Sequence, residues 1–247
     1  MRSGSDSRHL RPLARASAAV SSGSVPLRMA LINARSIANK SFILNNLFAS
    51  KGLDFMFLTE TWQRSMEHGP LIELCPPDCS FICTPRTSGQ GGGLAVVYRN
   101  CFLSLMVSTG DFSSFEVQMT KVGRSNPFYC ILIYRPPGFN SSFMAEFSEF
   151  LSSIIWLDRV IMVGDFNIHV DDVSCSFAAD FLNITESFNF IQHVSGATCI
   201  RGHTLDLVFT LGLNIDCICS EELHVTDHRC VLFNLSFNLD SQPSKKC

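Results

Sequence analysis

Short apolar runs that end in polar residues recur along the chain, and their spacing separates strands from helices. Runs rich in β-branched and aromatic residues predict strands, whereas apolar residues three and four positions apart predict amphipathic helices. Strands are expected over 29–32, 54–58, 94–98, 115–119, 128–133, 160–163, 203–209 and 230–235. Helices are expected from an N-cap at Ser36 to Gly52, over 143–155 and over 177–188. Prolines at positions 70, 76, 77 and 85 favour irregular structure over 63–93.

Residues 160–167, Val-Ile-Met-Val-Gly-Asp-Phe-Asn, form the most informative of these patterns. The four apolar residues predict a strand buried on both faces. Residues i and i+2 of a strand point to the same side, so Asp165 and Asn167 can face one site while Phe166 packs away. Such a carboxylate can orient a water molecule or hold a metal ion, and the amide can donate to an anion. A strand end followed by an Asx turn explains these residues equally well, so the rest of the chain must decide.

Size and composition predict a well-packed α/β domain, or two small ones, in 247 residues with 21 Phe. No apolar run approaches the roughly 18 residues that a membrane-spanning helix needs. The net charge of −3 gives no sign of a nucleic-acid partner and counts against tight nonspecific DNA binding. The 11 cysteines contain no C-x-x-C pair, so we expect reduced thiols in an intracellular, non-secreted protein.

The two ends of the chain differ in composition from its centre. Residues 1–24 are rich in Ser, Ala and Arg without an apolar segment, which argues against a secretory signal. A disordered extension is favoured over a mitochondrial transit peptide, whose composition is similar. The domain is therefore expected over 25–238, with a frayed polar tail over 239–247.

Polar side chains lie beside nearly every strong predicted strand. They are Asn33, Glu60, Tyr134, Asp165, Asn167, Asp206, Asp227 and His228. Ligands of layered α/β proteins bind at strand ends, where the loops converge, so this repetition suggests one acidic site. Gathered carboxylates repel one another, and a divalent cation is their natural counter-charge. Oxygen ligands favour Mg²⁺ or Mn²⁺ over zinc. The triplet Gly91-Gly92-Gly93 precedes a strand and no helix, which favours a tight turn over a phosphate cradle.

An ordered set of short motifs runs through the same positions. They are L-I-N-A-R-S, L-T-E-T-W, G-G-G-L-A-V-V-Y-R, I-Y-R-P-P, G-D-F-N, H-T-L-D-L-V and T-D-H. With them the chain resembles, from about 25 to 235, the endonuclease domain of LINE-type (non-LTR) retrotransposons. That domain belongs to the exonuclease–endonuclease–phosphatase superfamily, with apurinic endonucleases and deoxyribonuclease I. Thr226 stands where the family usually has Ser, which keeps a hydroxyl group. The chain is too short to include the reverse transcriptase that normally follows.

The resemblance implies an α/β fold of four layers, a deoxyribonuclease I-like two-sheet β-sandwich flanked by helices. It also implies a Mg²⁺-dependent phosphodiester hydrolase that nicks DNA and leaves a 3′ hydroxyl. Glu60 would be the principal metal ligand, supported by Asn33 and Asp227. A monomer in the cell interior is expected, with the nucleus as one location.

The resemblance assigns the remaining residues to catalysis. Asp165 would position and deprotonate the attacking water. Asn167 and Tyr134 would hold the nonbridging phosphate oxygens. His228, oriented by Asp206, would stabilise the charge that builds on the phosphate, since an Asp–His pair fixes the imidazole tautomer and favours its protonated form.

Two other hypotheses stay open. One is a phosphatase of the same superfamily that acts on a small phosphorylated substrate. The other is an inactive remnant that only binds nucleic acid or a partner, although every expected catalytic side chain is present. Trp62 and Arg135 are left undecided between packing and substrate contact.

Overall fold

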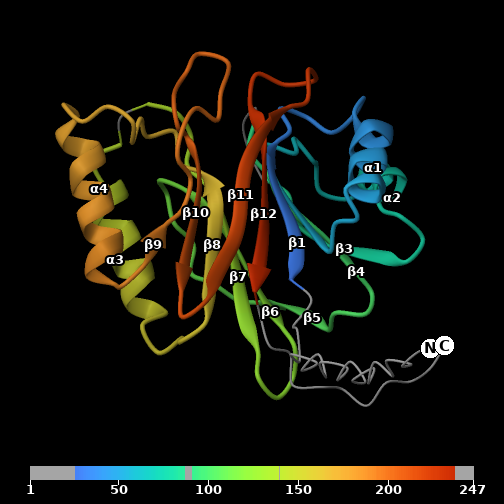
Figure 1. Ribbon diagram of the computed structural model, residues 1–247, viewed down its shortest axis with the longest axis horizontal. Helices are drawn as coiled ribbons and strands as arrows, with labels where there is room; N and C mark the ends of the chain where they lie inside the picture. Colours follow the sequence, from blue (N-terminus) through green and yellow to red (C-terminus); the bar gives the residue numbers. More distant parts are fainter. Residues whose placement is uncertain (1–25, 87–90, 139, 237–247) are drawn as a thin grey trace, which may run out of the picture.

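Two six-stranded β-sheets pack face to face between two pairs of helices (Figure 1). The structure is a computed structural model that describes residues 26–86, 91–138 and 140–236. The expected N-terminal extension, 1–24, and the expected C-terminal tail, 239–247, lie outside the described residues. Among the residues described, no helix is both long and apolar enough to cross a membrane.

The first sheet has the strand order β11-β12-β1-β2-β4-β3. Its strands are β11 (Asn214–Glu222), β12 (Arg229–Ser236), β1 (Leu27–Asn33), β2 (Phe55–Thr59), β4 (Leu94–Arg99) and β3 (Cys79–Thr84). The short helices α1 (Ser41–Ser50) and α2 (Gly69–Leu74) cover its outer face, where Leu44 and Phe48 pack against Ile32 and Leu58.

The second sheet has the order β5-β6-β7-β8-β10-β9. Its strands are β5 (Ser104–Val107), β6 (Glu116–Val122), β7 (Phe128–Tyr134), β8 (Val160–Asp165), β10 (Asp206–Leu211) and β9 (Ile191–Gln192). Helices α3 (Phe143–Ser153) and α4 (Ser176–Ser187) cover its outer face through rings such as Phe147 and Phe181, which contact Phe166. The result is the predicted four-layer sandwich, and Phe166 packs away from the sheet end as expected.

Strand direction brings the polar strand ends together. The parallel pair β1–β2 sets Asn33 beside Thr59, so Glu60 follows directly next to it. In the second sheet, the parallel pair β7–β8 sets Tyr134 beside Asp165, and the antiparallel β10 sets Asp206 on the other side of Asp165. Both sheets therefore present their polar strand ends at the same edge of the sandwich.

Gly164 has a packing reason to be glycine. A Cβ there would lie 2.0 Å from the backbone oxygen of Ile133, on the neighbouring strand β7. Any side chain would therefore push β8 away from β7 one residue before Asp165. The glycine of the G-D-F-N motif allows the close approach that places the carboxylate.

Local predictions failed in three places. The helix expected from Ser36 begins at Ser41, because residues 34–37 continue to bond to the chain after β2: Ser36 N–H donates to Glu60 O and Ile37 N–H to Thr61 O. The segment 63–93 is not irregular throughout, since it contains α2 and β3. Pro70 stands in the first turn of α2, where a missing N–H costs little. The strand expected over 203–209 begins only at Asp206, so that carboxylate opens β10 instead of lying inside it.

Candidate active site

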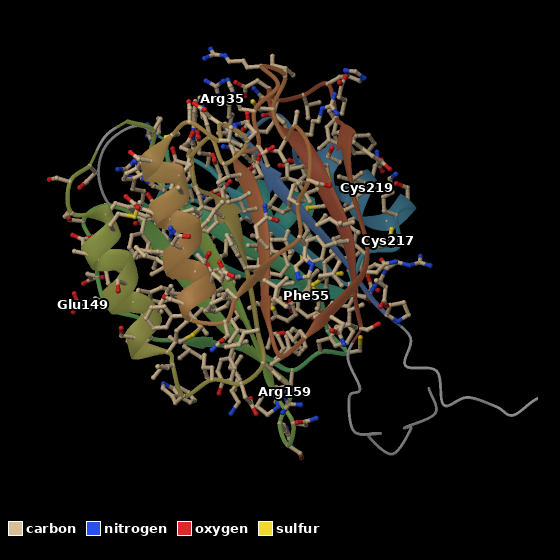
Figure 2. The ribbon with its side chains drawn as sticks, turned by 60° about the vertical axis from the view of Figure 1, so that its left-hand side comes forward. Arg35, Phe55, Glu149, Arg159, Cys217 and Cys219 are labelled. Atoms are coloured by element: carbon tan, nitrogen blue, oxygen red, sulfur yellow. The ribbon has the colours of Figure 1, made fainter. Side chains whose placement is uncertain are left out.

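A cleft of about 900 Å³ opens at the edge where the polar strand ends meet. Five of the eight predicted site residues line it: Glu60, Tyr134, Asn167, Asp227 and His228. The other three, Asn33, Asp165 and Asp206, are fully buried. Figure 2 shows Arg35, which also lines the cleft, at the opposite end of the molecule from Arg159. The structure thus brings all eight predicted residues to one end of the sandwich.

Asn33 joins the two sheets beneath the cleft. Its Nδ2 atom donates to Glu60 Oε1 at 3.0 Å and to Asp165 Oδ2 at 2.7 Å. Glu60 follows β2 of the first sheet, whereas Asp165 ends β8 of the second. One buried amide therefore fixes the distance between two carboxylates that belong to different layers.

Asp165 accepts hydrogen bonds from the turn that follows it. Asn167 donates to this carboxylate from its backbone N–H, at 3.0 Å, and from Nδ2, at 3.1 Å. Complete burial raises the pKa of Asp165, and the nearby charge of Asp206 raises it further. The charge of His228 and the donated hydrogen bonds oppose this shift without cancelling it. A carboxylate with a raised pKa is a stronger base, which suits proton uptake near neutral pH.

His228 and Asp206 form a buried pair. Nδ1 of His228 donates to Asp206 Oδ2 at 2.7 Å. Burial alone would lower the pKa of His228, but the hydrogen bond to Asp206 and the nearby carboxylate charges outweigh it and raise the pKa to about 9. The imidazole is therefore a cation at neutral pH.

Thr198, which no sequence pattern singled out, holds this pair in place. Its hydroxyl oxygen accepts the backbone N–H groups of Leu205 and Asp206, both at 2.9 Å. Its backbone oxygen accepts the N–H of Arg229 at 2.7 Å. Fully buried, Thr198 thus ties the start of β10 to the residue after His228. A lone Thr outside any motif carries no chemical pattern that would have marked it.

Both carboxylate oxygens of Glu60 accept hydrogen bonds. Beside the bond from Asn33, Glu60 Oε2 accepts the indole N–H of Trp62 at 3.2 Å, and Tyr134 is also hydrogen-bonded to Glu60. Burial, with the charges of Glu60 and Asp165, raises the pKa of Tyr134, so its hydroxyl keeps its proton and can donate.

Asp227, the third predicted metal ligand, has a different partner. Its Oδ2 atom pairs with the guanidinium of Arg35 at 2.6 Å. The backbone N–H of Arg35 in turn donates to Asn33 Oδ1 at 3.1 Å. Asp227 is therefore linked to Asn33 through Arg35 and has no direct bond to Glu60 among the contacts described.

The donor set fits a hard divalent cation. No Lys or Arg of the described segments forms an ion pair with Glu60 or Asp165. Asp206 Oδ1 is buried without a hydrogen-bond partner in the described part of the chain. Ligand atoms of Asp165, Asp206 and His228 lie within 4.8 Å of one another, a group that could hold an ion. Glu60 and Asp165 therefore have no ion-pair partner of their own in the described segments, and a bound ion would supply one; the ion's assignment to Glu60, Asn33 and Asp227 stays a prediction.

The carboxylate of Glu116 lies against the glycine triplet, at the place where a bound anion would otherwise be expected. Gly93 N–H donates to Glu116 Oε2 at 2.6 Å, and a Cβ on Gly92 would lie 2.2 Å from Glu116 Oε1. All three glycines have positive φ. As expected, a strand and no helix follows the triplet, since β4 begins at Leu94, whereas the tight turn itself stays a prediction. The carboxylate of Glu116, which no sequence pattern singled out, lies against Gly92 and Gly93.

Arg135 is a packing residue. Its buried guanidinium donates to the backbone oxygens of Phe166, Asn167 and Gly138 and lies over the rings of Phe143 and Phe177. It therefore supports the turn after β8 from behind and has no path to a substrate. Trp62, the other undecided residue, lies in the cleft with 48% of its surface exposed.

Comparison with known proteins identifies relatives of this fold. Residues 30–228 match the model of the Endonuclease/Exonuclease/phosphatase family. A search of curated proteins finds no match. The structure is similar to the endonuclease domain of TRAS1, a telomere-specific non-LTR retrotransposon, with a TM-score of 0.69 and 12% identity over 85% of this chain and 98% of that one.

Two further solved structures have the same fold. The AP endonuclease LMAP from Leishmania major has a TM-score of 0.69 and 14% identity over 86% of this chain and 88% of its own. A mannosyl-6-phosphatase from Bacteroides thetaiotaomicron has a TM-score of 0.59 and 13% identity over 85% of this chain and all of its own. The fold is thus common to proteins named for cutting DNA and for releasing phosphate from a sugar.

Proposed function

The chain belongs to the endonuclease/exonuclease/phosphatase family, and on that premise we propose that it is a divalent-metal-dependent phosphodiesterase that nicks DNA and leaves a 3′ hydroxyl. The observation that carries this proposal is that all eight predicted residues, contributed by both sheets, lie together: five line one cleft and three are buried beside it. The motif set shared with retrotransposon endonucleases favours DNA as the substrate.

In this mechanism, Asp165 takes the proton of the water that attacks the phosphorus atom. The three hydrogen bonds that its carboxylate accepts, from Asn33 and Asn167, orient it, and its raised pKa makes it a stronger base. Glu60 and Asn33, with Asp227, would hold a divalent cation, which when bound neutralises charge on the phosphate and on the leaving 3′ oxygen.

His228 and Tyr134 act on the phosphate oxygens. Both carry a proton at neutral pH, since the pKa of each is raised, so both can donate to the charge that develops. Asp206 keeps Nδ1 of His228 protonated and leaves Nε2 to face the cleft.

Asn167 must exchange a hydrogen bond to take its expected role. Both hydrogens of its Nδ2 are engaged, one by Arg135 O at 2.8 Å and one by Asp165 Oδ2 at 3.1 Å. The bond to Asp165 is the longer of the two, and it weakens further when that carboxylate takes up a proton. Release of this bond would free Asn167 to hold a nonbridging oxygen during the same step.

Relaxation of supercoiled plasmid tests the proposal. The purified chain should nick the plasmid in Mg²⁺ and not in EDTA, and Asp165→Asn should lower the rate by roughly 10²-fold or more. Asp158→Asn is the matched control, because this exposed aspartate precedes the opposite end of β8. Nicking that persists in EDTA, or equal rates in Asp165→Asn and the parent, would contradict the mechanism.

Two other outcomes would replace the proposal. Release of phosphate from mannose 6-phosphate without nicking would make the chain a phosphatase. Retention of DNA in a gel-shift assay, with no nicking in Mg²⁺ or Mn²⁺, would make it a binding module.

A further inference from the structure

Trp62 exposes an aromatic ring at the edge of the candidate active site. Its side chain lines the cleft, and 48% of its surface is exposed, although large aromatic residues usually bury most of theirs. The indole N–H donates to Glu60 Oε2. The polar edge of the ring is therefore anchored, while its apolar area remains in contact with solvent.

The backbone that carries this ring is held firmly. Trp62 N–H donates to Gly92 O at 2.9 Å and Thr61 N–H to Gly93 O at 3.1 Å. Gly93 is itself held by Glu116, whose carboxylate accepts the Gly93 N–H. Trp62 also has a φ of +54°, a conformation that residues other than glycine rarely adopt. Such strain in an exposed aromatic residue indicates a functional reason for its position.

Unpaired cations lie in the same cleft. Of the arginines that line it, Arg35 and Arg86 form ion pairs with Asp227 and Glu116. Arg64 and Arg201 line the cleft without an ion pair in the described part of the chain. An exposed aromatic ring in one cleft with unpaired guanidinium groups is a combination that can bind an unstacked base and its flanking phosphates.

We propose that Trp62 stacks on a nucleobase beside the cleaved phosphodiester, so that the substrate is DNA with a base unstacked at the cut. This inference deepens the proposed function and rests on it. The same side chain holds Glu60 through its N–H, so stacking and the position of the predicted metal ligand are joined in one residue.

Tryptophan fluorescence can test the contact without catalysis. The chain has two tryptophans, and Trp156 is exposed and precedes the far end of β8, so Trp156→Phe leaves Trp62 as the one tryptophan, which can be excited selectively over tyrosine. In EDTA, a short oligothymidylate should quench this fluorescence. An abasic oligomer, which has phosphates without bases, and mannose 6-phosphate should not. Equal quenching by the abasic oligomer would overturn the inference.

Two substitutions separate the two roles of the ring. Trp62→Leu removes the ring face and should weaken oligothymidylate binding roughly 5- to 150-fold, the range for loss of one stacked base. Trp62→Phe keeps a ring face but loses the N–H, so it should lose less affinity than Trp62→Leu while needing more Mg²⁺ for nicking. Native-like affinity in Trp62→Leu would overturn the inference.

The outcomes also separate this inference from the proposed function. Plasmid nicking with an unchanged KM in Trp62→Leu would reject stacking and leave the nuclease assignment intact. Base-dependent quenching in a chain that never nicks DNA would support the contact and reject the nuclease.

Discussion

Replacement of Asp206 by asparagine should remove the charge that keeps His228 protonated. The two side chains are buried, and Nδ1 of His228 donates to Asp206 Oδ2 at 2.7 Å. Asparagine has nearly the same shape and can still accept this bond through its amide oxygen. The substitution therefore changes the charge of the pair more than its packing.

The size of the effect follows from the pKa of His228. That pKa is about 9, against an ordinary value of 6.5, and the difference corresponds to about 3 kcal/mol. Without Asp206, burial again favours the neutral ring, so we expect a pKa near or below 6.5. At pH 7.5 the protonated fraction would fall from nearly all to about one tenth or less. Nicking at that pH should then slow roughly 10-fold or more, in proportion to the loss of the protonated ring.

NMR titration of the histidine rings measures the pKa of His228 directly, and His228→Gln assigns its signal. Asp171→Asn is the matched control, because Asp171 pairs with Nδ1 of His203 at 3.0 Å on the surface. It should change the nicking rate by no more than about threefold, the scale of an exposed pair. A His228 pKa that stays near 9 in Asp206→Asn would refute the reasoning, as would a nicking rate within threefold of the parent.

The raised pKa of His228 also makes the free energy of unfolding depend on pH. The pKa of His228 is raised on folding, so its stabilising contribution is complete below about pH 6.5 and is lost as the pH rises through about 9. Asp206→Asn should therefore lower the free energy of unfolding more at pH 6 than at pH 10. Urea unfolding at the two pH values checks the sign.

Three further predictions concern residues that shape the site from outside the cleft. Gly92→Ala should melt about 3–10 °C below Gly196→Ala, since both positions have positive φ but only the first Cβ would strike the Glu116 carboxylate; equal melting temperatures in scanning fluorimetry would contradict this. Gly164→Ala should cost about 3 kcal/mol or more in urea unfolding, because its Cβ would meet a backbone oxygen of β7, and a loss below 1 kcal/mol would show that the strands can separate there. Arg135→Lys should cost about 2–4 kcal/mol and lower kcat more than KM, since one ammonium group cannot replace three carbonyl bonds and two ring contacts; steady-state nicking and thermal unfolding measure both.

The parts of the site that could be predicted from the sequence follow from short-range rules. An apolar run marks a strand, and the first polar residue after it marks the strand end, which is how Asn33, Glu60 and Asp165 were found. The parallel pairing of β1 with β2 and of β7 with β8 then brings those ends together. The family resemblance supplied the roles that spacing alone left open.

The parts that could not be predicted depend on long-range contacts. Ser36 carries an N-cap pattern, yet its backbone bonds to Glu60 and stays out of the helix. The glycine triplet predicts a turn, but nothing near it in the sequence identifies Glu116 as the carboxylate that packs against these glycines. Arg135 resembles a substrate contact until the rings of Phe143 and Phe177 enclose it. In each case at least one deciding partner lies more than 20 residues away in the chain, where local patterns carry no information.

Strain and charge at this cleft have a common explanation. Of the eight non-glycine residues with positive φ in the described segments, five line the cleft: Arg35, Ser36, Glu60, Trp62 and Asn167. Each such conformation costs on the order of 1–3 kcal/mol, and the adjacent buried carboxylates Asp165 and Asp206 add a repulsive cost. Strained backbone and adjacent carboxylates persist only where the surrounding structure is rigid enough to hold them. Here the two packed sheets hold them, and the amide of Asn33 joins the sheets. The sandwich therefore holds the carboxylates in place before any ion or phosphate binds, so little free energy of binding is needed to arrange them.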